Sequence, residues 1–121
     1  MIAFTVYGEP IPKARPRVIK HSERVVTYTT KRTADWEQGI ACAANLAMGN
    51  QVPLSGPLAV TLRFYRKDGR RVDIDNLAKS ALDSMNGIVY RDDGQVVDLH
   101  ASKAQDKARP RIEVEVAGFT P

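Results

Sequence analysis

The sequence predicts an α+β domain in which two helices pack on a mixed β-sheet. Three observations predict this class. Short stretches of alternating apolar and polar residues are typical of strands, two longer stretches carry apolar residues at helical spacing, and segments with Gly or Pro separate them. The expected order is strand, strand, helix, strand, helix, strand, strand, at residues 2–8, 25–29, 30–48, 58–66, 75–85, 95–104 and 110–116. The length predicts a single domain over residues 1–121.

The first half of the chain is expected to supply two strands and one helix. Residues 2–8 are β-branched and aromatic in rough alternation, which is typical of a strand. Residues 9–24 contain three prolines and several basic residues. Because proline disfavours helices and central strands, this segment is expected to be an extended basic arm or loop. The helix that follows carries an apolar face that begins with Trp36 and Ile40.

The second half supplies the clearest strand, in which Leu58, Val60, Leu62 and Phe64 alternate with more polar residues. The second helix is expected to begin at Asp75, because aspartate is a good N-cap. The last two strands are separated by only a few polar residues, 106–109, which suggests a hairpin connection between them.

Composition narrows the classes of function. The net charge is +4 and the pI is about 9.4, which suits a partner that is a polyanion. Cys42 is the only cysteine, so an intramolecular disulfide and a cysteine-based zinc site are excluded. The N-terminus lacks the pattern of a signal peptide, and no apolar run approaches the roughly 20 residues of a membrane span. A cytoplasmic location without membrane contact is therefore expected.

Most of the candidate chemistry lies in residues 70–98, an acidic stretch in a basic protein. Asp73 and Asp75 are two residues apart, and a second pair, Asp92 and Asp93, follows. Carboxylates this close repel each other unless a positive group lies between them. In an oxygen-rich cluster that group is usually a hard divalent cation such as Mg²⁺. The pattern indicates a metal-dependent nuclease.

Two geometries remain open for the first pair. If residues 73–75 are extended, both carboxylates point the same way and can bind one cation. If Asp75 caps the helix instead, Lys79 lies one turn further on the same side. The simplest alternative is that Asp75 only caps the helix and Asp73 pairs with a neighbouring arginine. Asp92 and Asp93 have their own alternative, since Asp-Asp-Gly is ordinary turn chemistry.

Basic and aromatic side chains are candidates for contacts with nucleic acid. The candidate phosphate contacts are Lys13, Arg15, Arg17, Lys20, Arg24, Arg63, Arg66, Lys67, Arg70 and Arg71. Tyr7, Tyr28 and Tyr90 could stack on bases, whereas the position of Trp36 on the apolar helix face favours the core. Solvated surface positions are the alternative for the basic residues.

Two motifs together resemble the RusA family of Holliday junction resolvases. They are Asp-Ile-Asp-Asn-Leu-Ala-Lys at residues 73–79 and Asp-Asp-Gly-Gln-Val-Val-Asp at residues 92–98. The arm Pro-Ile-Pro-Lys-Ala-Arg-Pro-Arg at residues 10–17 resembles the N-terminal part of phage-type members. Such enzymes are small crossover junction endodeoxyribonucleases, often encoded by prophages, that act in DNA recombination and repair.

The resemblance implies a site and a reaction. Asp73, Asp75 and Asp93 would be catalytic carboxylates that bind Mg²⁺, Lys79 the catalytic lysine, and Asp92 a further acidic position that could also bind the metal. It also implies a homodimer that cuts four-way junction DNA by paired, symmetric nicks. The residues expected to contact DNA are Lys13, Arg15, Arg17, Lys20, Arg70, Arg71 and Lys103.

Two other functions fit the same residues. One is a non-catalytic DNA-binding protein of phage origin, which would bind junctions without Mg²⁺-dependent cutting. The other is a nuclease of broader branched-DNA specificity, which would cut flaps or single strands as fast as four-way junctions.

Overall fold

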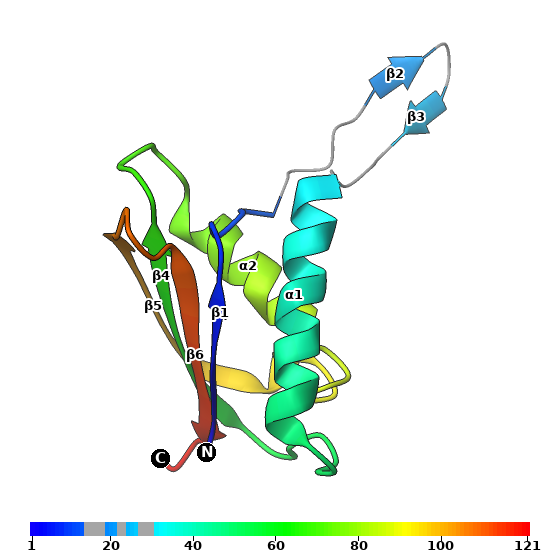
Figure 1. Ribbon diagram of the computed structural model, residues 1–121. Helices are drawn as coiled ribbons and strands as arrows, with labels where there is room; N and C mark the ends of the chain where they lie inside the picture. Colours follow the sequence, from blue (N-terminus) through cyan, green and yellow to red (C-terminus); the bar gives the residue numbers. More distant parts are fainter. Residues whose placement is uncertain (14–18, 22–23, 27–30) are drawn as a thin grey trace.

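The computed structural model describes residues 1–13, 19–21, 24–26 and 31–121. Figure 1 shows a sheet with two helices against one of its faces, so the predicted α+β class is confirmed. The elements are β1 (Ile2–Tyr7), β2 (Ile19–His21), β3 (Arg24–Val26), α1 (Lys31–Met48), β4 (Leu58–Arg66), α2 (Ile74–Ser84), the 3-10 turn η1 (Asp93–Gln95), β5 (Val96–Gln105) and β6 (Arg111–Gly118).

The main sheet is mixed, as predicted. Its four strands lie in the order β1-β6-β4-β5. β6 pairs antiparallel with both β1 and β4, whereas β4 and β5 are parallel. Phe64 on β4 lies opposite Ile112 on β6 and Lys103 on β5, which fixes the register on both sides of the central strand.

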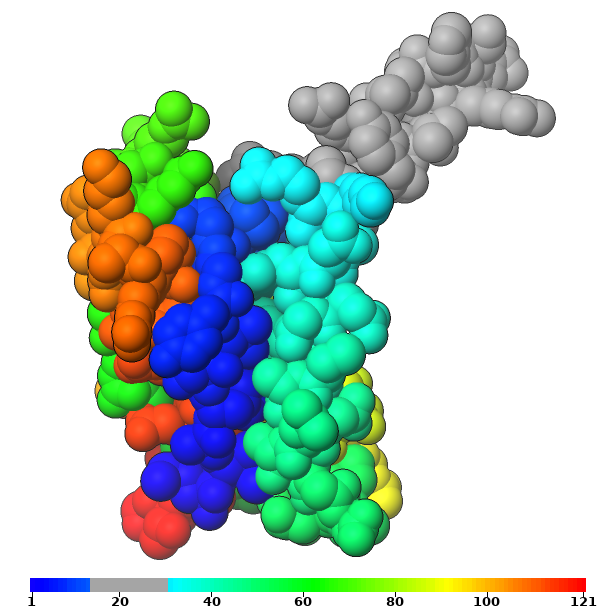
Figure 2. Space-filling view, in the orientation of Figure 1, coloured from blue at the N-terminus to red at the C-terminus, as the bar shows by residue number. Residues whose placement is uncertain are grey.

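The predicted hairpin between the last two strands is wrong. β4 lies between β5 and β6, so residues 106–109 cross the end of β4 instead of making a tight turn. The backbone N–H of Asp106 donates to the carbonyl of Arg66 at 2.7 Å, and Figure 2 shows the connection (orange) against the segment that follows β4 (green). The apolar strand β4 gains a hydrogen-bonded neighbour on each side by this arrangement, which shields it better than an edge position would.

The core lies between the sheet and the helices. Alternate residues of β4 are buried, as the sequence predicted, and they face the small and apolar residues of both helices. The central members of this core are Ile40, Ala44, Leu58, Val60, Leu62, Phe64, Leu77, Ala81, Met85, Ile112, Val114 and Val116. Within the ranges that the structure describes, no helix is both long enough and apolar enough to span a membrane.

The basic arm differs from expectation in one respect. Residues 9–24 were expected to lack regular structure, but Ile19–His21 form strand β2, which pairs antiparallel with β3 as a separate sheet (Figure 1). The three prolines precede this strand and leave its backbone N–H groups available. β3 covers the start of the predicted strand 25–29. The predictions for Arg15, Arg17 and Tyr28 lie outside the described residues.

Candidate active site

The first acidic pair lies at the N-terminus of α2, in a geometry that neither expectation gave. Asp73 is the extended N-cap residue, with φ −74° and ψ 125°, and its side chain makes no capping hydrogen bond among the described residues. Asp75 lies inside the first turn, where its Oδ1 accepts the backbone N–H of Asn76 at 3.0 Å. The prediction that Asp75 begins the helix is therefore wrong. Both carboxylates are exposed beside the positive end of the helix dipole.

One face of α2 carries alternating charges. Asp75, Lys79 and Asp83 follow each other at intervals of four residues and so lie along one side of the helix. Lys79 Nζ is 3.7 Å from Asp83 Oδ2, and the lysine side chain is 63% exposed. The helical rise separates Asp75 from Asp83 by about 12 Å. Lys79 thus lies between a carboxylate at each end of the face.

Asp83 and Asp93 come together from different parts of the chain. Their carboxyl groups lie near enough to each other for Asp83 to raise the pKa of Asp93. Burial raises the pKa of Asp93, and the nearby carboxylates of Asp92 and Asp83 raise it further, while Lys79 opposes them. Two carboxylates in such contact need a proton or a cation between them. The sequence prediction missed Asp83, although its place eight residues after Asp75 was a usable signal.

Tyr90 lies beneath these carboxylates. It is fully buried, and its hydroxyl donates to the carbonyl of Leu82 at 2.6 Å. Burial raises its pKa, and so do the charges of Asp93 and Asp83. The prediction that Tyr90 could stack on bases is therefore wrong, because the ring has no exposed face. Trp36 is buried in the core, as its position on the helix favoured.

The second motif forms a rigid turn in which Asp92 is the cap of η1. Asp92 Oδ2 accepts the backbone N–H of Gly94 at 2.8 Å. Gln95 Oε1 accepts the N–H of Asp92 at 3.3 Å, while its Nε2 donates to the carbonyls of Leu54 at 2.9 Å and Gly56 at 3.1 Å. The turn that carries Asp93 is thereby fixed to the loop before β4. The turn interpretation of Asp-Asp-Gly holds for Asp92, and Gln95 is a supporting residue that the sequence prediction missed.

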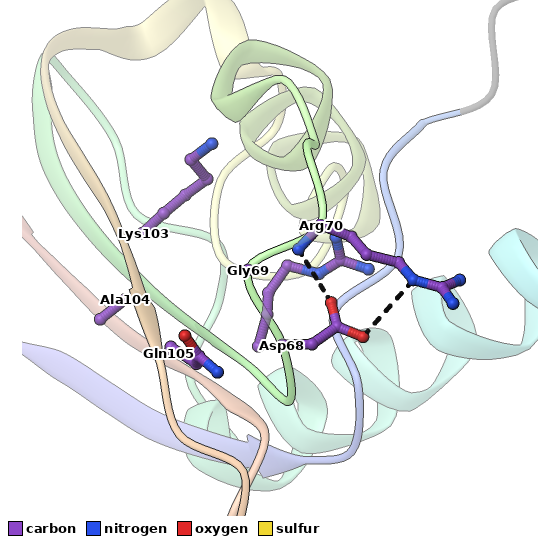
Figure 3. Close-up of a pocket in the computed structure, with 7 residues that line it drawn as sticks. Asp68, Gly69, Arg70, Lys103, Ala104 and Gln105 are labelled. Carbon is purple, nitrogen blue, oxygen red and sulfur yellow. Dashed lines mark hydrogen bonds and ion pairs between the residues drawn. The ribbon is translucent and has the colours of Figure 1, made fainter.

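Basic residues gather around the segment that leads into α2 (Figure 3). Lys103 Nζ donates to the carbonyl of Val72 at 2.7 Å, directly before Asp73. Arg70 pairs with Asp68, 3.7 Å from Nε to Oδ2, and not with Asp73. A shallow hollow beside them is lined by Arg66, Asp68, Gly69, Arg70, Lys103, Ala104 and Gln105. Arg71 is exposed nearby, so this corner can present positive charge to an anion.

Lys13 is a residue of the arm that contacts both helices. Its Nζ is 3.1 Å from Glu37 Oε2 on α1 and 3.6 Å from Asp83 Oδ2 on α2. Its backbone N–H donates to the carbonyl of Asn76 at 2.9 Å. Lys20 belongs to strand β2.

The predicted metal-binding carboxylates are not gathered around one point. Within the described ranges, no three His, Cys, Asp or Glu side chains lie close enough together to hold a metal ion. Asp73 and Asp75 lie at the start of α2, whereas Asp93 lies beside Asp83 at its end. The assignment of Asp73, Asp75 and Asp93 to metal therefore stays a prediction.

Known proteins resemble the chain over nearly its whole length. A family model described as Endodeoxyribonuclease RusA matches residues 7–117. The YqaN protein of Bacillus subtilis (strain 168) is 29% identical over 136 residues, which cover 95% of this chain and 94% of that protein. The Crossover junction endodeoxyribonuclease RusA of Escherichia coli (strain K12) is 28% identical over 108 residues, 88% of each chain. The chain therefore belongs to the RusA family of endodeoxyribonucleases.

Proposed function

We propose that the chain is a divalent-metal-dependent, structure-selective endodeoxyribonuclease that resolves Holliday junctions by paired symmetric nicks, in DNA recombination and repair. The observation that carries this proposal is the contact of Asp83 with Asp93 beside Lys79, in a member of this family. Like charges held together at a surface are unfavourable unless a ligand of opposite charge completes them. A divalent cation is such a ligand.

The residues present fit Mg²⁺ in the chemistry of their donors. Each candidate ligand is a carboxylate, and Mg²⁺ prefers oxygen ligands while keeping several waters. We assign divalent metal to Asp73 and Asp75 at the start of α2 and to Asp93 on the η1 turn, with Asp83 in support and Asp92 as the cap that holds the turn. When bound, the ion supplies a polarised phosphodiester and a water of lowered pKa.

The chain's own basic residues would place the DNA. Lys79 is exposed and lies between Asp75 and Asp83, so its ammonium group can contact the scissile phosphate and stabilise the negative charge that develops there. Arg70, Arg71 and Lys103 would contact backbone phosphates beside the start of α2.

A homodimer and a cytoplasmic location complete the proposal. A four-way junction offers two equivalent strands, and a two-fold dimer offers two equivalent sites at which they can be cut. In a cell that lacks a nucleus, four-way junction DNA lies in the cytoplasm. Arg15, Arg17 and Lys20 of the arm are the remaining residues assigned to DNA binding.

The test is the cleavage of synthetic junctions mapped at nucleotide resolution. A mobile and a fixed four-way junction are incubated with the protein in Mg²⁺ and in EDTA, beside flap and duplex controls. The proposal expects symmetric nicks in four-way junctions that require Mg²⁺. Junction binding without cutting would favour the non-catalytic alternative, and equal cutting of flaps would favour the broader nuclease.

A further inference from the structure

Lys13 is held more firmly than Lys79, the other lysine that contacts Asp83. Its side chain is 27% exposed, compared with 63% for Lys79. Its ammonium group contacts both oxygens of Glu37, at 3.1 and 3.3 Å, and Asp83 as well. The backbone of Lys13 is also fixed, by the hydrogen bond to Asn76 at 2.9 Å.

The charge around Lys13 argues against a simple phosphate contact. The ammonium group of Lys13 faces two carboxylates, those of Glu37 and Asp83, so its positive charge is already compensated within the fold. A phosphate that approached Lys13 would have to displace one of these partners. Arg70, Arg71 and Lys79 are more exposed, and Arg70 and Lys79 each pair with a single carboxylate, at the longer distance of 3.7 Å.

Asp83 is the residue on which Lys13 acts. Its Oδ2 lies 3.6 Å from Lys13 Nζ and 3.7 Å from Lys79 Nζ, and its carboxyl group lies near that of Asp93. Asp83 is therefore held by Lys13 of the arm and by Lys79 of its own helix. Because Lys13 and Asp83 are both partly buried, bulk salt screens their ion pair less than it screens an ion pair at the surface.

We propose that Lys13 is a positioning residue of the nuclease site, which holds Asp83 in its contact with Asp93 and so fixes the carboxylates for the reaction. The inference rests on the proposed function and deepens it. Lys13 also links the arm to both helices, since Glu37 belongs to α1 and Asp83 to α2.

The test separates a positioning role from a phosphate contact. Lys13→Met removes the ammonium group and keeps an unbranched side chain, while Lys13→Arg restores the charge. Lys31→Met is the matched control, because it removes one exposed lysine charge at the first residue of α1. For each protein, the single-turnover cleavage rate of a four-way junction in Mg²⁺ and the junction Kd in EDTA at several salt concentrations are measured.

The expected result is a loss of rate without a loss of binding. Lys13→Met should lower the single-turnover rate by about tenfold or more, with Kd within about twofold of wild type and an unchanged salt slope. Lys13→Arg should recover most of the rate, and Lys31→Met should cleave at the wild-type rate. If Lys13→Met fails to fold, Glu37→Gln serves instead. It should also lower the single-turnover rate, with Kd unchanged.

Two results would overturn the inference. One is a Lys13→Met rate within about twofold of wild type. The other is a defect confined to Kd, with the salt slope reduced by about one, which is the sign of a lost phosphate contact. Failure of the proposed function can be distinguished from failure of this inference, because the wild-type protein itself would then cut no branched DNA.

Discussion

Strand β5 has a carboxylate group at each end, and the two groups are held in opposite ways. Asp106 follows the strand and accepts a hydrogen bond from Arg111 Nη1 at 2.8 Å, with further bonds from backbone N–H groups. The pKa of Asp106 is lowered, chiefly by the hydrogen bond from Arg111. Asp93 precedes the strand, and burial and the neighbouring carboxylates raise its pKa.

The difference separates a structural carboxylate from a functional one. The negative charge of Asp106 is compensated within the fold, since Arg111 also stacks on the Tyr65 ring at 3.8 Å and binds Glu113. The charge of Asp93 is opposed by its neighbours and only partly offset by Lys79. A fold gains nothing from such an arrangement by itself, so a ligand outside the chain is the natural partner of Asp93.

Removing one charge at each end of β5 should have a large effect on cleavage at Asp93 and none at Asp106. Asp93→Asn should lower the rate of junction cleavage by about 100- to 1,000-fold, because it removes a proposed metal ligand. Asp106→Asn should leave the single-turnover rate of the folded protein unchanged. Single-turnover assays at saturating protein measure both. Equal losses in the two variants would erase the distinction between the two groups.

A smaller effect is expected where the acidic turn is fixed to the fold. Gln95→Ala removes the side chain that bonds to Leu54, Gly56 and Asp92, so it should lower the free energy of unfolding by about 1–3 kcal/mol. Because Asp93 lies on this turn, cleavage should also fall, by about 10-fold or more. Urea denaturation and the cleavage assay give the two values. Gln51→Ala is the control, at an exposed glutamine, and a loss as large there would count against the role of Gln95.

A more local change is expected at Gly94. A Cβ atom there would lie 2.7 Å from Asp92 Oδ2, so Gly94→Ala must displace the capping carboxylate. Loss of that cap should cost about 0.5–2 kcal/mol of stability. Gly118→Ala is the matched control, since a Cβ there meets nothing within 4 Å. Thermal unfolding of the two variants compares them, and equal Tm values would contradict the tight fit.

The smallest expected effect is on the pH dependence of the free energy of unfolding. Its sign should differ between Asp106 and Asp93, which lie at the two ends of β5. The lowered pKa of Asp106 means that its stabilising contribution is present above the unfolded pKa and is lost as pH falls through the folded pKa. The stability difference between wild type and Asp106→Asn should therefore shrink in acid.

Asp93 should behave in the opposite way. Its raised pKa means that the folded state favours the protonated form, an advantage that is present in acid and is lost as pH rises through the folded pKa. In the absence of metal, Asp93→Asn should then be slightly more stable than wild type at neutral pH, and this gain should vanish in acid. Both differences can be followed by measuring Tm of wild type, Asp106→Asn and Asp93→Asn without metal from acid to neutral pH. If the Tm curves of the three proteins ran parallel, the account would be contradicted.

The sequence predicted those parts of the fold that local patterns determine. The alternation in β4 and the helical spacing in α2 located these elements almost to the residue. The pairing of β4 with both β5 and β6 was beyond reach, because a short connection at residues 106–109 looks the same whether or not it crosses another strand. Strand order depends on contacts between distant segments, which one sequence does not display.

Only part of the site was predicted, because the rest also depends on contacts between distant segments. Asp93 and Lys79 were found from their motifs, but the partnership of Asp93 with Asp83 joins a helix to a distant turn. Gln95 looked like an ordinary polar residue, and only the fold shows that it binds the loop before β4. Lys13 was assigned to DNA from its charge alone, whereas its two carboxylate partners lie on separate helices.

The central claim is that the charged face of α2 and the η1 turn form a nuclease site. The most direct measurement is single-turnover cleavage of a four-way junction by Asp75→Asn, together with its junction Kd. Asp75 is exposed, so its replacement should leave the fold intact. The account predicts that cleavage is abolished while binding is retained. Full cleavage activity in Asp75→Asn would contradict it.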